Sequence, residues 1–321
     1  MKTKKIVALL LSTTMLLGCV AGCSKVKKVD EKSMEKAADK VEVDVEEISD
    51  IDDLEDFDSD DLEDGILFTI DPDMIEDAMD EEGIDEDDIE EAIDMINDMM
   101  DAEIEFEIDD IEEISVYAQV DGDNVAVVVY ANLGDSNLAS EAFRIMADST
   151  EDINDELEDL ADDADYDLDG YEFNLKKLSG KEYYNGKNSG YIKLCLTPDD
   201  IQDIIENEFK DAVEKADLDI DEDDIDDMAD EIIDEIPYDI MAGGVYYNGG
   251  SLVVTFIASD DDDMIDQYDK FMKSIGLASP TDVKPSKYFK QTVANGIVMY
   301  ASMMMNSYSK YADIDYNDFD F

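Results

Sequence analysis

Leu67–Ile75 reads LFTIDPDMI, and Leu194–Ile201 reads LCLTPDDI. Each segment passes from a short apolar, strand-like run through a capping residue and a proline into the start of a helix. Asp71 and Thr197 can accept hydrogen bonds from free backbone amides, and proline suits the first helical position because no amide partner is lost there. The chain therefore contains an internal repeat whose copies each begin with a strand and a helix.

A second pair of matching segments extends the repeat. Ile84–Ile89 and Ile220–Ile225 share the sequence IDEDDI. The segments after them carry apolar residues three and four positions apart, which predicts helices with one apolar stripe each. These stripes consist of Ile89, Ala92, Ile93, Ile96 and Met100 in the first copy, and of Ile225, Met228, Ala229, Ile232 and Ile236 in the second.

Each copy then predicts a β-hairpin followed by a closing helix. Asp121-Gly122 and Asn248-Gly249 are tight-turn pairs between strand-like segments. The strands are expected at 116–120, 125–130, 244–247 and 252–257, and the closing helices at 138–147 and 263–275. The fold class that follows is α+β, with two β-α-α-β-β-α-like repeats, mostly antiparallel strands and helices packed on the sheet. One shared sheet and two separate lobes both fit this pattern.

The repeat sets the domain boundaries. Repeat 1 spans 65–150 and repeat 2 spans 190–280, and a connecting helix and hairpin occupy 151–189. A further turn pair, Asn295-Gly296, lies between strand-like residues. It predicts a hairpin within a C-terminal segment at 281–321 that ends in a tail.

The N-terminus has the three parts of an export signal. Lys2, Lys4 and Lys5 form a positive region, and Ile6–Leu17 is apolar except for Ser12, Thr13 and Thr14. Val20–Cys23 reads VAGC, with small residues before a cysteine. This pattern resembles the lipobox of bacterial lipoproteins. In that class the cysteine thiol carries a diacylglycerol and becomes the first residue after cleavage.

The resemblance, which covers the leader only, implies a signal peptide at 1–22 and lipidation at Cys23. A second candidate box ends at Cys19, but Ala21 and Ser24 fit the family pattern better around Cys23. A plain secretory signal and an uncleaved membrane anchor are the alternatives, although Ile6–Gly22 is shorter than the roughly 20 residues of a spanning helix. We therefore expect a protein attached to the cell membrane by lipid and facing the extracytoplasmic side.

The chain is extremely acidic. Its formal net charge is −67, and removal of a leader with three lysines and no acids gives −67 − 3 = −70. Because nucleic-acid binding needs clustered Lys and Arg, this charge excludes nucleic acid as a partner and favours cations or basic partners. The hydrophobic content of 44% provides material for a core, so the acids are expected to coat a folded body.

Residues 23–64 change from lysine-rich beside Cys23 to heavily acidic with few aromatic residues. This composition predicts a lipid-anchored acidic tether. Lysines next to the lipid would contact anionic headgroups, each contributing about 1 kcal/mol, and the acidic remainder would be repelled from them.

One segment resembles part of a calcium loop. Asp165, Asp167 and Asp169 have the oxygen spacing of such a loop, and Gly170 stands at its turn position. The twelfth position is Lys176, where a bidentate acid is needed. The three aspartates are therefore a weak calcium candidate, beside the simpler reading of general cation association.

Enzyme motifs are missing from the sequence. The chain has no histidine, so it lacks a Ser-His-Asp triad, a histidine base and a zinc-protease motif, and Cys195 has no histidine to activate it. We expect no enzymatic activity and no cofactor beyond weak Ca²⁺, and we expect a binding module of unknown ligand. The alternatives are a carboxylate-dependent hydrolase of envelope or environmental polysaccharide and a diffuse cation-binding surface protein.

Overall fold

The computed structural model divides the chain into two compact units, which are described in turn. The first is built from 1–149, 181–197 and 237–284, and the second from 150–180, 198–236 and 285–321. The structure describes residues 28–41, 44–45, 65–70, 72–74, 111–134, 140, 154, 157–158, 172–186, 188–215, 225, 227, 229, 232–233 and 236–298.

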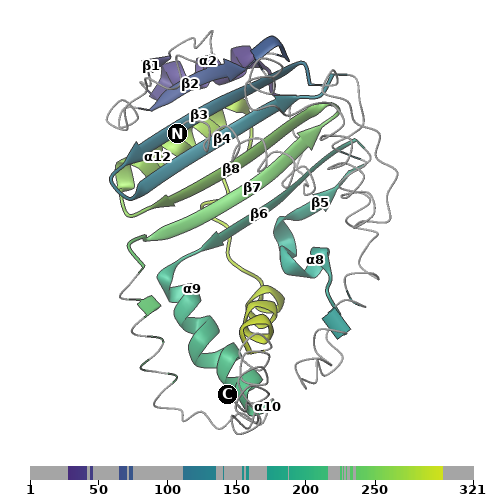
Figure 1. Ribbon diagram of the computed structural model, residues 1–321, viewed down its shortest axis with the longest axis vertical. Coiled ribbons are helices and arrows are strands. Elements are labelled where there is room, and N and C mark those ends of the chain that lie inside the picture. Colours follow the sequence, from purple (N-terminus) through teal and green to yellow (C-terminus); the bar gives the residue numbers. More distant parts are fainter. Residues whose placement is uncertain are drawn as a thin grey trace, which may run out of the picture. The chain divides into compact units, whose positions relative to one another are not determined.

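The first unit contains an eight-stranded sheet in the order β1-β2-β3-β4-β8-β7-β6-β5 (Figure 1). Every pair of neighbouring strands is antiparallel except β1 and β2 at one edge, which are parallel. The strands are β1 (Asp44–Val45), β2 (Ile66–Ile70), β3 (Glu113–Asp121), β4 (Asn124–Asn132), β5 (Tyr183–Asn185), β6 (Ser189–Leu196), β7 (Ile240–Asn248) and β8 (Ser251–Ser259). The predicted α+β fold with mostly antiparallel strands is confirmed.

The two copies of the repeat share this sheet. Strands β2, β3 and β4 come from the first copy, β6, β7 and β8 come from the second, and the copies meet where β4 pairs with β8. Val128 lies opposite Thr255, and 255 − 128 = 127. The same offset separates the repeated Leu67 from Leu194, since 194 − 67 = 127. Equivalent residues of the two copies therefore face each other at the centre of one continuous sheet.

Helices cover one face of the sheet. Helix α12 (Asp262–Ile275) lies behind the strands in Figure 1 and contacts α2 (Glu31–Val41). It begins where the Asp261 side chain accepts a hydrogen bond from the Asp263 amide at 2.9 Å. It ends at Gly276, whose φ of 87° lies in the left-handed region that favours glycine. Its bounds agree with the predicted helix at 263–275.

Helix α2 contradicts the predicted tether over 31–41, the part of 23–64 that the helix occupies. Met34, Ala37, Ala38 and Val41 are buried in the core, at the three- and four-residue spacing of one helix face. Asp30 caps the helix, since its carboxylate accepts from the Ser33 amide at 2.8 Å and its own amide donates to the Ser33 hydroxyl at 2.9 Å. This segment belongs to the body because its small apolar stripe packs well and its three acidic residues are balanced by three lysines.

The core between sheet and helices is rich in tyrosine. The Tyr117 ring stacks on Phe271 with ring centroids 4.2 Å apart, and the Tyr268 hydroxyl shares a hydrogen bond with Thr255. Burial raises the pKa of the Tyr117, Tyr246 and Tyr268 phenols, so these groups stay protonated. Cys195 lies in the same core and is buried, which agrees with a structural role.

The second unit is helical in its described part. Pro198 begins a continuous helical segment, as predicted, formed by α9 (Pro198–Asp203), a π-helical stretch η4 (Ile204–Phe209) and α10 (Lys210–Lys215). A further helix occupies 287–298. The predicted hairpin around Asn295-Gly296 is therefore wrong, because Ala294 and Val298 are spaced for one helix face and are buried.

The hairpin predicted within 151–189 is absent from 172–180. The short helix α8 (Leu175–Leu178) stands there, capped by Asn174, whose side chain accepts from the Lys177 amide at 3.1 Å. The Ser286 hydroxyl donates to the Lys177 carbonyl at 2.8 Å and so binds this helix to the chain before helix 287–298. The hairpin of this region is formed instead by β5 and β6, which pair antiparallel.

An ion-pair network joins helix 287–298 to α9. The Lys290 ammonium lies 2.9 Å from the Asp200 carboxylate and 2.8 Å from that of Asp203. The hydrogen bond from Lys290 holds the pKa of Asp203 below its ordinary value. Burial acts to lower the pKa of Lys290, but the hydrogen bonds and charges of the two aspartates outweigh it, so that pKa is raised.

These shifts set the pH range over which the network stabilises the second unit. The lowered pKa of Asp203 means that its contribution is present above its unfolded pKa of about 4 and is lost as the pH falls through the folded value. The raised pKa of Lys290 means that its contribution is present below about pH 10 and is lost as the pH rises through the folded value.

Replacing Lys290 with methionine is expected to raise the pKa of Asp203 toward its ordinary value, because the main cause of the lowering is removed. Carboxylate chemical shifts followed by NMR against pH measure this change. Lys273→Met, in the first unit, removes the same charge and should leave Asp203 unaffected. An Asp203 titration that is the same in the Lys290 variant and the native protein would contradict the network.

Candidate functional site

The sheet face opposite α12 and α2 is apolar throughout its central strands. In β8, Val253 and Ile257 lie in the helix-covered core, so Val254 and Phe256 lie on the other face. By the same alternation and the pairing of the strands, this face of β3, β4, β6 and β7 carries only Ile, Val, Leu, Ala, Met, Gly and Tyr. Val116, Val129, Val245 and Leu252 of this face are buried, so contacts within the chain account for much of this exclusion of charge.

Part of this face is open to solvent. The register aligns one residue from each of five strands in a row, and we call this row the Phe256 patch. Its members are Ala118, Val127, Phe256, Gly243 and Leu194. Phe256, at its centre, is 47% exposed and the other four are partly exposed. Large exposed aromatic residues in the middle of an apolar face are typical of binding surfaces.

Gly243 leaves room beside the Phe256 ring. A Cβ atom at Gly243 would lie 3.8 Å from the Phe256 Cδ2 atom and 3.2 Å from the Thr255 carbonyl oxygen. Any side chain there would therefore lie against the ring. Because glycine has none, one edge of the ring stays accessible to a ligand.

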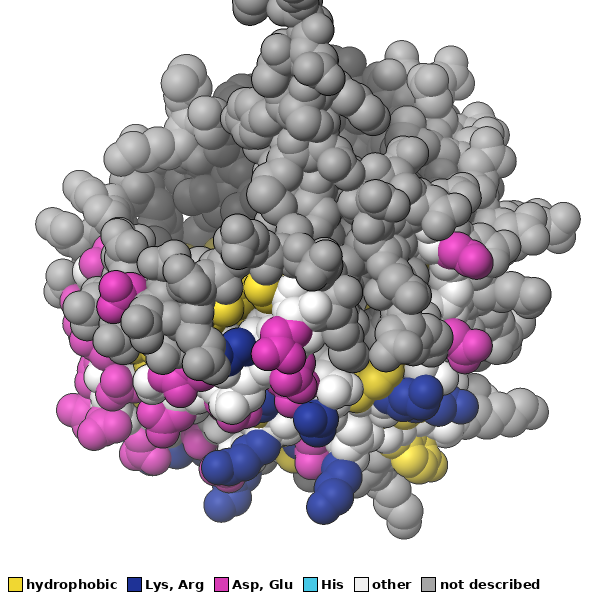
Figure 2. Space-filling view, turned by 90° about the horizontal axis from the view of Figure 1, so that it is seen from below, with side chains coloured by type: hydrophobic (Ala, Val, Ile, Leu, Met, Phe, Trp, Pro, Cys, Tyr) yellow, Lys and Arg dark blue, Asp and Glu magenta, His cyan; other side chains and the backbone are white. Residues whose placement is uncertain are grey.

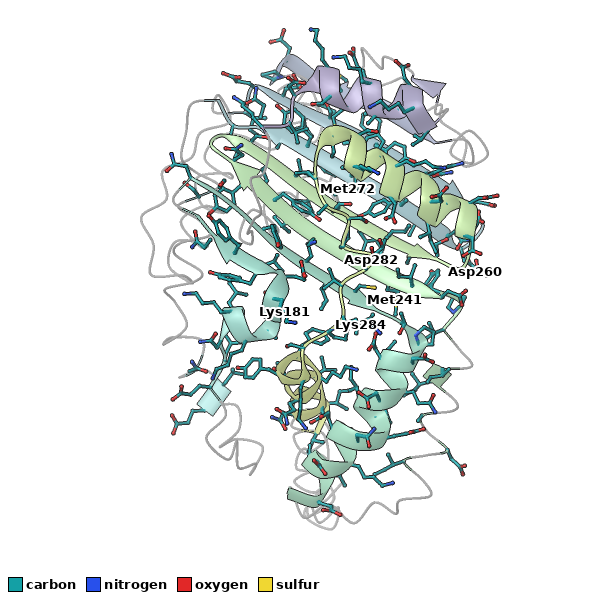
Figure 3. The ribbon with its side chains drawn as sticks, turned by 180° about the vertical axis from the view of Figure 1, so that it is seen from behind. Lys181, Met241, Asp260, Met272, Asp282 and Lys284 are labelled. Atoms are coloured by element: carbon teal, nitrogen blue, oxygen red, sulfur yellow. The ribbon has the colours of Figure 1, made fainter. Side chains whose placement is uncertain are left out.

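Three aspartates stand at one end of the strands that form the patch, and we call them the acidic row. They are Asp123, Asp239 and Asp260, all of them exposed. The Asp239 amide donates to the Ser259 carbonyl at 3.1 Å, which places it beside Asp260. The Asp260 amide in turn donates to the Asn124 side chain at 2.8 Å, next to Asp123. Figure 3 labels Met241 at the start of β7 and Asp260 at this same end of the sheet.

The acidic row has no basic residue near it in the flanking strands. β3, β4, β7 and β8 contain no Lys or Arg. Elsewhere on the described surface, lysine side chains gather beside acidic ones, as the face in Figure 2 shows. Neighbouring strands lie about 4.8 Å apart, so the backbones of the three aspartates fall within roughly 10 Å of one another, close enough for their fields to add.

A partly buried ion pair at the β5–β6 edge is structural. The Lys193 ammonium lies 3.0 Å from the Glu182 carboxylate, 3.4 Å from the Ser279 carbonyl oxygen and 4.9 Å from the centroid of the Tyr191 ring. The Tyr246 hydroxyl donates to the Ala278 carbonyl at 2.7 Å. These bonds fix the chain after α12 onto the sheet, and Lys193 is already fully engaged.

The structure does not describe the site residues that were singled out from the sequence. Cys23 and the calcium candidates Asp165, Asp167 and Asp169 are all outside the described residues. Among the residues that the structure does describe, no three His, Cys, Asp or Glu side chains come together as metal ligands. Nor does any helix in that part of the chain have the length and apolar character needed to cross a bilayer.

The Phe256 patch was not predicted, although the sequence carries a signal for it. Strands β4 and β8 read NVAVVVYAN and SLVVTFIAS, in which apolar residues point to both faces instead of alternating with charged ones. Such strands need contacts on both sides. Comparison with known proteins found no significant match to any family model, curated protein or solved structure.

Proposed function

We propose that this chain is an exported, lipid-anchored surface protein that binds a partner through the Phe256 patch and has no catalytic activity. The observation that carries the proposal is the exposed Phe256 ring at the centre of an uncharged sheet face. Contiguous exposed apolar residues, here Phe256 with its partly exposed neighbours Val127 and Leu194, are typical of a surface that a ligand covers. The lipobox-like leader ending at Cys23 supports export and anchoring.

The structured body begins close to the proposed anchor. Val29 is buried in the core, and Cys23 precedes it by 29 − 23 = 6 residues. Six residues reach at most about 22 Å when fully extended. A body lipidated at Cys23 would therefore stay near the membrane surface, where its binding patch is available to other envelope components.

Replacing Cys23 with alanine is expected to abolish membrane attachment, because the thiol that carries the lipid is removed. Mass spectrometry of the native N-terminus should find Cys23 as the first residue, with the added mass of a diacylglycerol. Cys19→Ala is the matched control and should leave attachment unchanged. A lipid on Cys19, or an unmodified Met1 on the mature protein, would contradict the assignment.

A photo-reactive benzoylphenylalanine at position 256 tests the binding surface in the living cell. Illumination should give a cross-linked product of higher mass from this position. Ile297 is the control, since it is a 43% exposed apolar residue of the second unit. Absence of a product from position 256, or identical products from both positions, would refute a binding role for the patch.

A further inference from the structure

We infer that the Phe256 patch and the acidic row together form a docking surface for a cationic amphipathic segment of a partner protein. Such a segment carries apolar side chains on one side and Lys or Arg on the other. This inference rests on the proposed binding function and names the chemistry of the partner.

The apolar half of the surface requires an apolar side of the partner. The patch has a ring at its centre, partly exposed Val127 beside it on one strand and side-chain-free Gly243 on the other. No charged or hydrogen-bonding side chain of these three positions is available to orient a polar ligand. Affinity at the patch therefore comes from burying the Phe256 ring and its neighbours.

The acidic half requires positive charge on the same partner. Asp260 lies four residues beyond Phe256 on β8, a distance of about 13 Å along the strand. A helix with its side chains is about 10–12 Å across, so one helix can cover the ring and still present a flank to the aspartates. The fields of Asp123, Asp239 and Asp260 add at that flank, which favours Lys or Arg there.

The same charges argue against the other occupants of an apolar face. A second copy of this chain brings its own acidic row and shares the net charge of −67, so like charges oppose a face-to-face dimer. A membrane surface rich in anionic lipids is repelled for the same reason. Of these three occupants, only a cationic amphipathic segment satisfies both halves of the surface.

The test uses a defined probe, a fluorescein-labelled peptide of 18 leucines and lysines whose leucines recur at three- and four-residue spacing. Binding to the full chain is measured by fluorescence anisotropy at about 0.15 M salt, where long-range attraction is largely screened. Phe256→Thr should weaken binding by about tenfold, as loss of a central aromatic anchor does. Asp123→Asn combined with Asp260→Asn should weaken it by about threefold to tenfold, because close charge pairs are lost.

Matched variants control for general charge and for folding. Ile297→Thr removes an equally exposed apolar residue, and Asp211→Asn with Glu214→Gln removes two exposed charges of α10. Both should change the affinity by less than about twofold, since surface changes away from a contact have small effects. Thermal unfolding should be nearly the same for native protein and Phe256→Thr, because threonine suits an exposed strand position.

Two results would overturn the inference. One is equal weakening by the control variants, or equal binding of a peptide with the same composition but scattered leucines, since either shows attraction by net charge alone. The other is a dimer, seen by sedimentation, that Phe256→Thr dissociates, which would make this face a contact between copies. In both cases a cross-linked product from position 256 could still form, so the proposed binding function is judged separately.

Discussion

Phe271→Ala should lower the free energy of unfolding by about 3–5 kcal/mol, the range for deleting a buried aromatic ring. Phe271 is fully buried in α12 and stacks on Tyr117 of β3. The pair joins the closing helix of the second copy to a strand of the first. Its loss therefore tests whether the two copies form one body, in addition to leaving a cavity.

Urea denaturation followed by circular dichroism measures this change. Lys270→Ala is the control. Lys270 lies on the same helix, and both side chains of its ion pair with Asp266 are exposed. An exposed pair contributes at most about 1 kcal/mol. A loss of less than about 1 kcal/mol in the Phe271 variant would mean that α12 does not pack on the sheet as described.

Ala37→Glu should destabilise the body by more than about 3 kcal/mol, because it places an unpaired charge at a buried position. Ala37 is fully buried on the face of α2 that contributes to the core. Limited proteolysis should also cut between α2 and β2 far faster in this variant. Urea denaturation provides the free energy.

Lys36→Glu introduces the same residue one position away on the exposed side of α2, and it should cost little. If both variants have the native stability and the same proteolysis pattern, α2 does not pack into the core. The acidic tether that composition predicts would then begin at Cys23 and extend through this helix.

Turn pairs and helix-start residues predicted the fold correctly where the tertiary packing favours the same local structure. The turn pairs at Gly122 and Gly249 and the repeated proline starts correctly placed β3, β4, β7, β8 and the beginning of α9. Composition gave a wrong prediction for α2, which was expected to be part of a tether. Its buried stripe includes the alanines Ala37 and Ala38, which contribute little to hydrophobicity averages. At Asn295-Gly296 the turn signal failed because helical packing of Ala294 and Val298 outweighed it.

The candidate site could not be predicted, because it depends on strand order. Ala118 and Leu194 are far apart in the sequence and become members of one row only when β4 and β8 pair. The repeat in the sequence is equally compatible with one shared sheet and with two separate lobes. The acidic row likewise draws on Asp123 of the first copy and on Asp239 and Asp260 of the second.

The most direct test of the central claim, that the Phe256 patch is a covered binding surface in the cell, is thiol modification at position 256. The variant is Phe256→Cys in a Cys195→Ala background, compared with Ile297→Cys in the same background. We expect the position 256 thiol to react rapidly in purified protein and much more slowly in native membranes, and the position 297 thiol to react alike in both. Equal rates at position 256 in the two preparations would contradict the account.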